Sequence, residues 1–146
     1  MIHFKWYKFS ELSVDQLYDL LALRFEVFFI EQHCFDLDPD GKDKFALHLL
    51  GQKDSLVAYM RVFPPTDAEK FIKFGRVVTA KSERGKGYGK DLMHELLTYC
   101  HINYPGTVIK CSAQLYLKKF YEDFGFNAVG DIYDEAGIPH IIMQKG

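Results

Sequence analysis

The sequence predicts a mixed α/β (α+β) fold, in which helices flank a mixed central sheet, on the basis of three observations. Apolar residues switch between strand-like and helix-like spacing in the order strand, helix, strands, helix, strand, helix, strands. A glycine-rich loop over residues 84–89 joins a strand-like run to a helix-like run. No linker or repeat divides the 146 residues, so we expect one domain over residues 1–146.

The N-terminal half is expected to form a strand, a long helix and a hairpin. Residues 13–16 have the form of a capping box, which opens a helix that runs through Glu31. An acidic loop over residues 36–43 follows, and then a hairpin with strands over 45–51 and 56–63. We expect the helix to pack on the sheet through apolar residues at helical spacing: Val14, Leu17, Tyr18, Leu21, Phe25 and Phe28.

The second half is expected to form a strand, a helix, a strand, a helix and two strands, over residues 71–79, 90–101, 107–113, 115–124, 127–133 and 138–144. The first of these helices places five residues on one face: Leu92, Met93, Leu96, Leu97 and Cys100. The second carries a stripe of Leu117, Phe120, Tyr121 and Phe124, and Gly125 ends it.

The loop Arg84-Gly85-Lys86-Gly87-Tyr88-Gly89 has the properties of a pyrophosphate-binding loop. Glycines allow a tight turn and a close approach of the ligand, and the first N–H groups of the next helix point outward unpaired. The spacing does not fit a Walker loop, and Lys90 stands where a dinucleotide fingerprint needs glycine. The alternative is a solvated glycine turn with two surface cations.

The same loop resembles the Arg/Gln-x-x-Gly-x-Gly/Ala signature of the GCN5-related N-acetyltransferases, with Arg84, Gly87 and Gly89 in register. A later strand and helix, with Tyr121 four residues before Gly125-Phe126, resemble that family's second motif. The two motifs also occur in the family's order and at its separation.

Two further segments resemble a smaller branch of that family, the ElaA-like proteins. One is Arg24 to Gln32 with the acidic loop after it, and the other is Tyr133 to His140. Together the resemblances cover nearly the whole chain.

The resemblance implies direct transfer of an acetyl group from acetyl-CoA to an amine of a small molecule or peptide. The residues from Arg84 to Gly89 would bind the pyrophosphate, and the strand edge Val77-Val78-Thr79 would bind the pantetheine arm. The Val78 N–H would stabilise the developing oxyanion. Gln114 stands where many members place an Asn that contacts the cofactor, which is a departure from the family pattern.

Tyr121 is the candidate general acid. A phenol, with a pKa of about 10, can protonate a departing thiolate whose conjugate acid has a pKa of about 8.5. The family register places Tyr121 in that role. The alternative is that Tyr121 only packs against the cofactor, as an aromatic residue at helical spacing.

The residue that deprotonates the amine is left open. Some relatives use a carboxylate on the strand before the glycine loop, but here that strand offers Lys73 and Arg76. The remaining candidates are a water relay or one of three side chains: Glu31, Glu135 and His140. Arg24 and Glu31 lie seven residues apart on one helical face, so they are predicted either to point at the acceptor site or to be ordinary charges.

No metal site is expected. Residues 36–41 match the start of an EF-hand loop, but Leu47 stands at the twelfth position and Pro39 stiffens the loop. We expect instead an acidic lip that attracts a cationic amine, or plain surface. Four further residues lack the pairwise spacing of zinc ligands: His33, Cys34, His48 and His140.

The composition points to small-molecule chemistry in a reducing cytoplasm. A net charge of −2 gives no general attraction to nucleic acid or anionic lipid, and no apolar run is long enough to span a membrane. The odd cysteine count, three, argues against a disulfide framework, and the first residues lack the apolar core of a signal peptide. A free sheet edge could support a homodimer.

Two alternative functions share this fold. The first is a non-catalytic module that binds or senses acyl-CoA, and the second is an acyltransferase that uses longer acyl chains.

Overall fold

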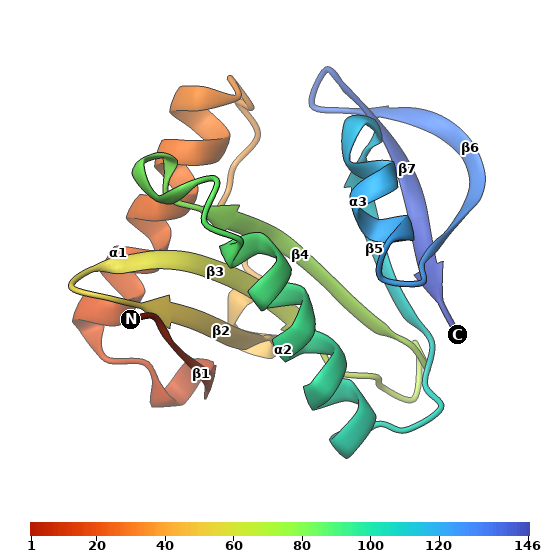
Figure 1. Ribbon diagram of the computed structural model, residues 1–146, viewed down its shortest axis with the longest axis horizontal. Coiled ribbons are helices and arrows are strands. Elements are labelled where there is room, and N and C mark those ends of the chain that lie inside the picture. The colour runs from red at the N-terminus through yellow and green to blue at the C-terminus, as the bar shows by residue number, and fades with distance from the viewer.

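The computed structural model describes residues 1–146 and contains a seven-stranded sheet in the order β1-β2-β3-β4-β5-β7-β6 (Figure 1). The neighbouring strands are antiparallel except β4 and β5, which are parallel. The strands are β1 (His3–Lys8), β2 (Leu47–Gln52), β3 (Leu56–Phe63), β4 (Ile72–Thr79), β5 (Ile109–Gln114), β6 (Asn127–Glu135) and β7 (Ile138–Lys145). The helices are α1 (Val14–Arg24), α2 (Tyr88–Asn103) and α3 (Lys118–Glu122). The predicted fold class and order of elements are confirmed.

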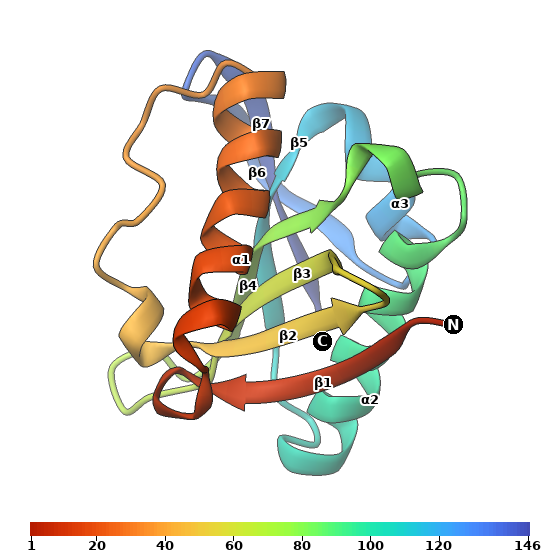
Figure 2. The ribbon, with the colours of Figure 1, turned by 90° about the vertical axis from the view of Figure 1, so that its left-hand side faces the viewer.

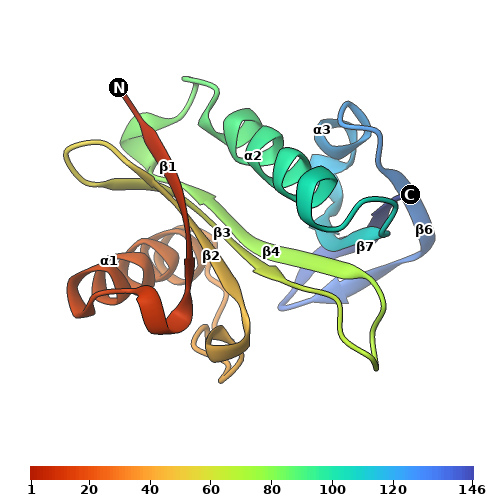
Figure 3. The ribbon, with the colours of Figure 1, turned by 90° about the horizontal axis from the view of Figure 1, so that it is seen from below.

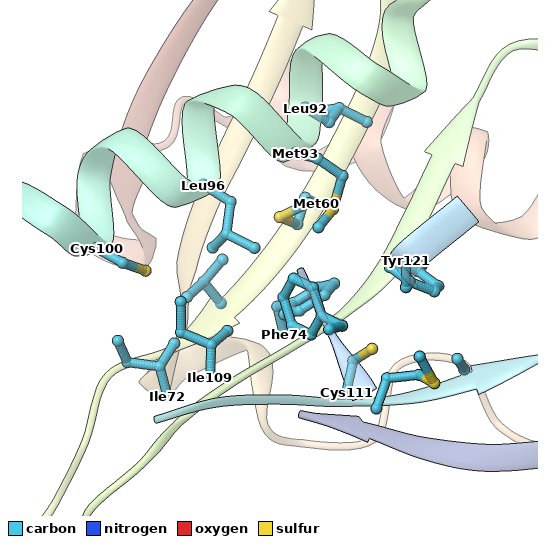
Figure 4. Packing of buried hydrophobic residues seen from close by; sticks show 14 of the residues in the cluster. Met60, Ile72, Phe74, Leu92, Met93, Leu96, Cys100, Ile109, Cys111 and Tyr121 are labelled. Atoms are coloured by element: carbon cyan, nitrogen blue, oxygen red, sulfur yellow. The ribbon is translucent and has the colours of Figure 1, made fainter. Parts of the chain in front are cut away.

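Helix α1 covers one face of the sheet, and α2 and α3 cover the other (Figures 2 and 3). The alternation along β3 supplies both faces, because Ala58, Met60 and Val62 join the core under α2 whereas Tyr59 joins the core under α1. Figure 4 shows the predicted face of α2 packed over the β3 and β4 side chains, with Leu92, Met93, Leu96 and Cys100 all buried.

The capping box of α1 is confirmed, but the predicted packing stripe is partly wrong. The Gln16 N–H donates to Ser13 Oγ at 3.0 Å, and the Ser13 N–H donates to Gln16 Oε1 at 2.9 Å. Val14 and Tyr18 are 85% and 74% exposed, and Phe25 is also exposed. The buried residues lie on the neighbouring face of the helix, next to the predicted stripe: Leu20, Leu23, Arg24 and Val27. This face was missed because it contains an arginine, which a search for apolar periodicity passes over.

The predicted helix does continue to Glu31, but the last seven residues form a π-helix, η2 (Phe25–Glu31). A π turn holds more residues than an α turn, so it changes the direction of the side chains that follow, and such turns often occur at functional sites. Arg24 and Glu31 therefore do not share one polar stripe. Arg24 is completely buried, and Glu31 lies at the surface.

Two other boundaries differ from the prediction. The strand expected from residue 45 begins at Leu47, because Asp43–Phe45 form a 3-10 turn, η3. The helix expected over residues 115–124 consists of a 3-10 turn, η5 (Leu115–Leu117), followed by the short α3. Its stripe still faces the core, where Tyr121 is buried.

The sheet opens between β4 and β5. These strands pair only at Ile72–Ile109 and Lys73–Lys110, and beyond those pairs their facing edges are unpaired. A bulge in β4 adds to the distortion, because three residue steps from Gly75 to Val78 lie opposite two steps on β3. Arg76, at the bulge, has a φ of +49°. The split leaves an open strand edge in the centre of the molecule.

Candidate functional site

The opening between β4 and β5 continues into a cavity of about 1080 Å³. Its walls come from both strands, from η2 and the acidic loop on one side, and from α3 and the β6–β7 turn on the other. Among the residues predicted to form the site, most line this cavity: Glu31, Val77, Val78, Thr79, Arg84, Gly89, Gln114, Tyr121, Glu135 and His140. Residues 85–88 lie beside it, and Arg24 does not reach it. A cavity of this size and position is typical of a small-molecule site.

The glycine loop forms an open anion-binding turn at one end of the cavity. Gly85 and Gly87 have φ of +80° and +84°, and Gly87 begins α2 without a side-chain cap. The backbone N–H groups of residues 85–90 donate to no acceptor in the protein. A Cβ atom at either glycine would meet no neighbour within 4 Å, so the space in front of these amides is free. Unpaired amides at a helix N-terminus suit the pyrophosphate of CoA.

Both cations of this loop already pair with carboxylates. Arg84 makes a bidentate ion pair with Glu31 of η2, with 2.8 Å between Arg84 Nη2 and Glu31 Oε1. This hydrogen bond lowers the pKa of the Glu31 carboxyl. Lys86 pairs with Glu83, which Lys53 also approaches at 3.3 Å. A bound pyrophosphate would therefore compete with Glu31 for Arg84.

The open edge of β4 presents a different amide from the one expected. The Ala80 N–H donates to the Val57 carbonyl of β3 at 2.8 Å. Alternate residues of an antiparallel ladder turn toward the same neighbour, so the Val78 N–H also faces β3. The backbone N–H and C=O groups that face the open edge are those of Val77 and Thr79. The Val77 N–H, rather than the Val78 N–H expected from the resemblance, therefore faces the open edge.

Tyr121 belongs to the buried cluster shown in Figure 4, and it also lines the cavity. Its ring packs against Phe74 and Phe126, with centroids 6.0 Å and 6.1 Å away, and no protein group hydrogen-bonds its hydroxyl. Burial, with smaller contributions from Cys111 and Tyr116, raises the pKa of Tyr121 well above its usual value. The phenol therefore stays protonated at neutral pH, as a proton donor must.

Gln114, at the end of β5, contacts the end of the first helix. Its Nε2 donates to Gln32 Oε1 at 2.9 Å. With the Glu31–Arg84 pair, this bond ties the end of η2 to both sides of the split sheet. The sequence did not single out Gln32. The π-helix directs Glu31 toward Arg84 and the next residue, Gln32, toward Gln114, and the sequence pattern does not reveal that geometry.

The acidic loop is neutralised rather than free. We call three arginines and three aspartates the acidic-loop network: Arg24, Arg61, Arg76, Asp38, Asp40 and Asp43. Within it, Arg24 contacts Asp38 at 2.9 Å and Asp43 at 2.7 Å. Burial opposes ionisation of Asp43, but hydrogen bonds and charge from the arginines lower its pKa overall. Asp38 and Asp40 therefore do not form a free acidic lip, and of the three aspartates in the EF-hand match only Asp36 has no ion pair.

His48 supports this network from the core. Its Nε2 lies 2.9 Å from the Asp43 carbonyl oxygen, so Nε2 carries the proton and donates it. The Tyr59 hydroxyl then donates to Nδ1 at 2.6 Å. Burial lowers the pKa of His48, and the nearby Asp43 only partly offsets this effect. The ring is neutral in the folded protein at neutral pH.

A second polar group lines the cavity at the β6–β7 hairpin. His140 Nε2 lies 3.3 Å from Glu135 Oε2, and Ser112 Oγ lies 3.3 Å from Glu135 Oε1. Ser112 also hydrogen-bonds the Tyr133 hydroxyl. The sequence pointed to Glu135 and His140 but missed Ser112 and Tyr133. The alternation of β5 places Ser112 on the same face as Gln114, which is the signal that could have found it.

Aromatic side chains line the same cavity from η2 and the acidic loop. Phe25 and Phe29 stack with ring centroids 4.8 Å apart, and Phe35 meets Phe29 edge to face at 5.3 Å. All three are exposed and contribute to the cavity wall. In a separate observation, none of the helices has the length and apolar character needed to cross a bilayer.

Comparison with known proteins agrees with this geometry. The family model described as an acetyltransferase (GNAT) domain matches residues 18–146. Protein ElaA of Escherichia coli is 42% identical over 148 residues, which cover 99% of this chain and 97% of ElaA. A UPF0039 protein of Synechocystis is 42% identical over 97% of this chain and 94% of its own length.

Two crystal structures superpose on the whole chain. An acyl-CoA N-acyltransferase from Pseudomonas aeruginosa has a TM-score of 0.95 and 36% identity, with 100% of both chains covered. The crystal structure of E. coli ElaA has a TM-score of 0.93 and 41% identity, again with 100% of both chains covered. The split sheet, the glycine loop and these full-length matches show that the chain belongs to the GNAT acetyltransferase family and, within it, to the ElaA-like branch.

Proposed function

We propose that the protein is an acetyl-CoA-dependent N-acyltransferase, which transfers an acetyl group directly to a primary amine of a small molecule or peptide. One observation supports this most strongly. A single cavity connects the glycine loop, the open edge of β4 and Tyr121. An acyl-CoA bound along this edge would have its thioester near a phenol that is protonated at neutral pH.

Each residue has a separate role in the proposed reaction. Acetyl-CoA supplies the thioester and a thiolate leaving group. The amides of residues 85–90 bind the pyrophosphate, and the open edge of β4 pairs with the extended pantetheine arm as an added strand would. The Val77 N–H stabilises negative charge that develops on the carbonyl oxygen. Tyr121 donates its hydroxyl proton to the departing sulfur.

The chemistry of Cys111 favours direct transfer over an acyl-enzyme. Cys111 lines the cavity, where a nucleophilic thiolate could accept the acetyl group. However, burial raises the pKa of the Cys111 thiol to about 12. Since the thiolate is the nucleophile, this side chain stays unreactive at neutral pH. The amine is then the group that attacks.

The setting of the reaction is part of the same proposal. All three cysteines are free, which fits a protein that works in the reducing cytoplasm. The proposed partner is the amine acceptor, and neither nucleic acid nor a membrane is required. The protein could also form a homodimer through a sheet edge. The proposed reaction does not depend on such a dimer, because one chain forms the whole cavity.

The test is thiol release from acetyl-CoA with a panel of small amines, polyamines, amino acids and peptide N-termini. Tyr121→Phe should lower kcat by about 10²–10⁴-fold, the usual contribution of a positioned acid. It should leave the CoA-induced rise in Tm unchanged. Tyr18→Phe is the matched control, because Tyr18 is 74% exposed and does not line the cavity.

Two outcomes would refute parts of the proposal. If the wild type binds CoA but releases no thiol with any amine, the protein is a binding or sensing module. If Tyr121→Phe retains full kcat, another group protonates the sulfur. Comparison of acetyl-CoA with octanoyl-CoA as donors tests whether longer acyl chains are preferred.

A further inference from the structure

The proposed reaction needs a group that deprotonates the ammonium form of the acceptor, and the β4 strand supplies none. The bulge residue Arg76 belongs to the acidic-loop network, and Lys73 is a cation. Glu31 is a poor base, because its pair with Arg84 lowers the pKa of its carboxyl. A base must therefore lie elsewhere on the cavity wall.

We propose that His140 is the general base for the acceptor amine, and that Glu135 balances the charge of the resulting imidazolium. This inference rests on the proposed function. The amine gives its proton to His140 Nε2, and Glu135 Oε2, which lies 3.3 Å from that nitrogen, stabilises the charge that forms on the ring.

The hydrogen bonds of His140 determine which nitrogen can accept the proton. His140 Nδ1 lies 2.7 Å from the Ile138 carbonyl oxygen, which accepts hydrogen bonds but cannot donate one. Nδ1 therefore carries a proton in every charge state. In the neutral ring the lone pair is on Nε2, the nitrogen that faces Glu135. A base whose tautomer is fixed by a second contact is the arrangement that proton-transfer sites require.

The strand register places this pair on the cavity side of the sheet. His140 lies opposite Gln114 on β5 and opposite Tyr133 on β6, so the three side chains project from the same face. The residues of β5 and β7 between them, such as Ala113 and Ile141, turn to the core under α2 and α3. The side chain of His140 is only 7% exposed, yet the residue lines the cavity.

Glu135 is held for its role from the other side. Ser112 Oγ approaches Glu135 Oε1, and Tyr133 hydrogen-bonds Ser112 in turn. The side chain of Glu135 is 53% exposed, and no Lys or Arg pairs with it. Its carboxylate is thus available both to an incoming ammonium and to the imidazolium of His140.

Charged groups on the opposite walls belong to η2, the acidic loop, β3 and β4. Glu31 pairs with Arg84, and the acidic-loop network neutralises Arg61 and Arg76. Three charged residues of the cavity lining have no ion pair: Asp36, Lys42 and Lys73. Asp36 is the one competing carboxylate, so it belongs in the test.

The proton and electron movements balance as follows. The ammonium gives one proton to His140 Nε2, and the nitrogen lone pair then forms the C–N bond with the thioester carbon. The C–S bond breaks, and its electron pair leaves on sulfur, which takes the proton of the Tyr121 hydroxyl. The proton that the new amide nitrogen loses restores the Tyr121 phenol. His140 finally releases its proton to solvent.

The experiment measures kcat and kcat/KM for thiol release against pH in the wild type and three variants: His140→Asn, Glu135→Gln and Asp36→Asn. His140→Asn should lower kcat at neutral pH by about 10²–10⁴-fold. Its rate should keep rising with pH toward the pKa of the free amine, about 10 for an alkylamine, because the solvent must then remove the proton. Glu135→Gln should retain the fold and the CoA-induced rise in Tm but lower kcat, since the imidazolium that forms on His140 loses its anionic partner at 3.3 Å.

Matched controls and a binding measurement separate chemistry from folding. His94→Asn and Asp131→Asn change an exposed histidine and an exposed carboxylate without partners in ion pairs, and should keep the wild-type profile. Every variant must also show the wild-type rise in Tm with CoA. If His140→Asn is too unstable for assay, the loss of kcat in Glu135→Gln, with the CoA-induced rise in Tm retained, decides alone.

Each outcome supports or overturns the inference. A wild-type profile in both His140→Asn and Glu135→Gln would overturn it, and so would a loss of activity confined to Asp36→Asn. If the wild type binds CoA but acetylates no amine, the proposed function fails and the inference fails with it. Thiol release by the wild type together with the predicted changes in both variants would establish the base.

Discussion

Replacement of Gly89 by leucine gives a direct test of the glycine loop as the CoA site, because the signature allows only glycine or alanine at this position. Gly89 lies in the first turn of α2, does not have a positive φ, and lines the cavity. A Cβ atom there would meet only Phe120 Cζ, at 3.8 Å, which is an ordinary contact. Gly85 and Gly87 are less suitable, because their positive φ would strain any side chain, even without ligand.

The variant should change the free protein and its response to CoA in different ways. Leucine is favoured over glycine within a helix by about 0.8–1 kcal/mol, so the free Tm should rise by about 2–4 °C. CoA at a hundredfold excess over its Kd stabilises the wild type by about 2.7 kcal/mol, which corresponds to a rise in Tm of about 5–10 °C. A leucine side chain is too large for the Gly/Ala position of the signature and would occupy space in the cavity that Gly89 lines, so the rise in Tm with CoA should be lost.

Differential scanning fluorimetry with and without CoA measures both effects. Thr98→Ala is the control, because Thr98 is exposed on the same helix and alanine also raises its helix propensity, far from the loop. Thr98→Ala should raise the free Tm and keep the full CoA shift. A full CoA shift in Gly89→Leu would refute the placement of the pyrophosphate at this loop.

Two further predictions concern ion pairs and pH. Glu31→Gln should free Arg84 for the pyrophosphate and tighten CoA binding by up to about fivefold, which is the affinity equivalent of one exposed ion pair. Glu26→Gln, which changes an exposed glutamate of the same helix, should leave the affinity unchanged. Calorimetry measures both affinities, and weaker binding by Glu31→Gln would contradict the prediction. The pKa of His48 is lowered in the folded state, so the unfolded state binds the proton first and the free energy of unfolding should fall as the pH drops through about 6.5. His48→Gln should remove that part of the pH dependence, and His94→Gln should retain it when urea unfolding is measured from pH 7 to 5.

Local patterns in the sequence predicted most of the fold. The capping box at Ser13, the hairpin of β2 and β3, and the buried face of α2 each depend on residues close together in the chain, and each is confirmed. The glycine loop was recognisable for the same reason. Its conformation follows from the residue types within six positions.

Features that depend on distant partners could not be predicted in this way. The bulge at Arg76 reverses which side of β4 faces each helix, so that Phe74 joins the core under α2 and Val78 the core under α1. Only the register with β3 shows that change. Likewise, Arg24 is buried because Asp38 and Asp43 neutralise it, and no spacing within the helix reveals those partners.

The neutralised acidic loop changes how the acceptor is expected to reach the site. A ring of free aspartates would attract any cation from a distance, but Asp38 and Asp40 are occupied by arginines. Removal of one partner from a buried ion pair costs about 3–5 kcal/mol. Asp38 and Asp43, which pair with the buried Arg24, are therefore held in place and are not available to bind an ammonium. In the proposed reaction the attraction for an ammonium would then be concentrated at Glu135 and Asp36, the carboxylates of the cavity without a Lys or Arg partner. Selectivity would depend on where the amine fits against His140, more than on its total positive charge.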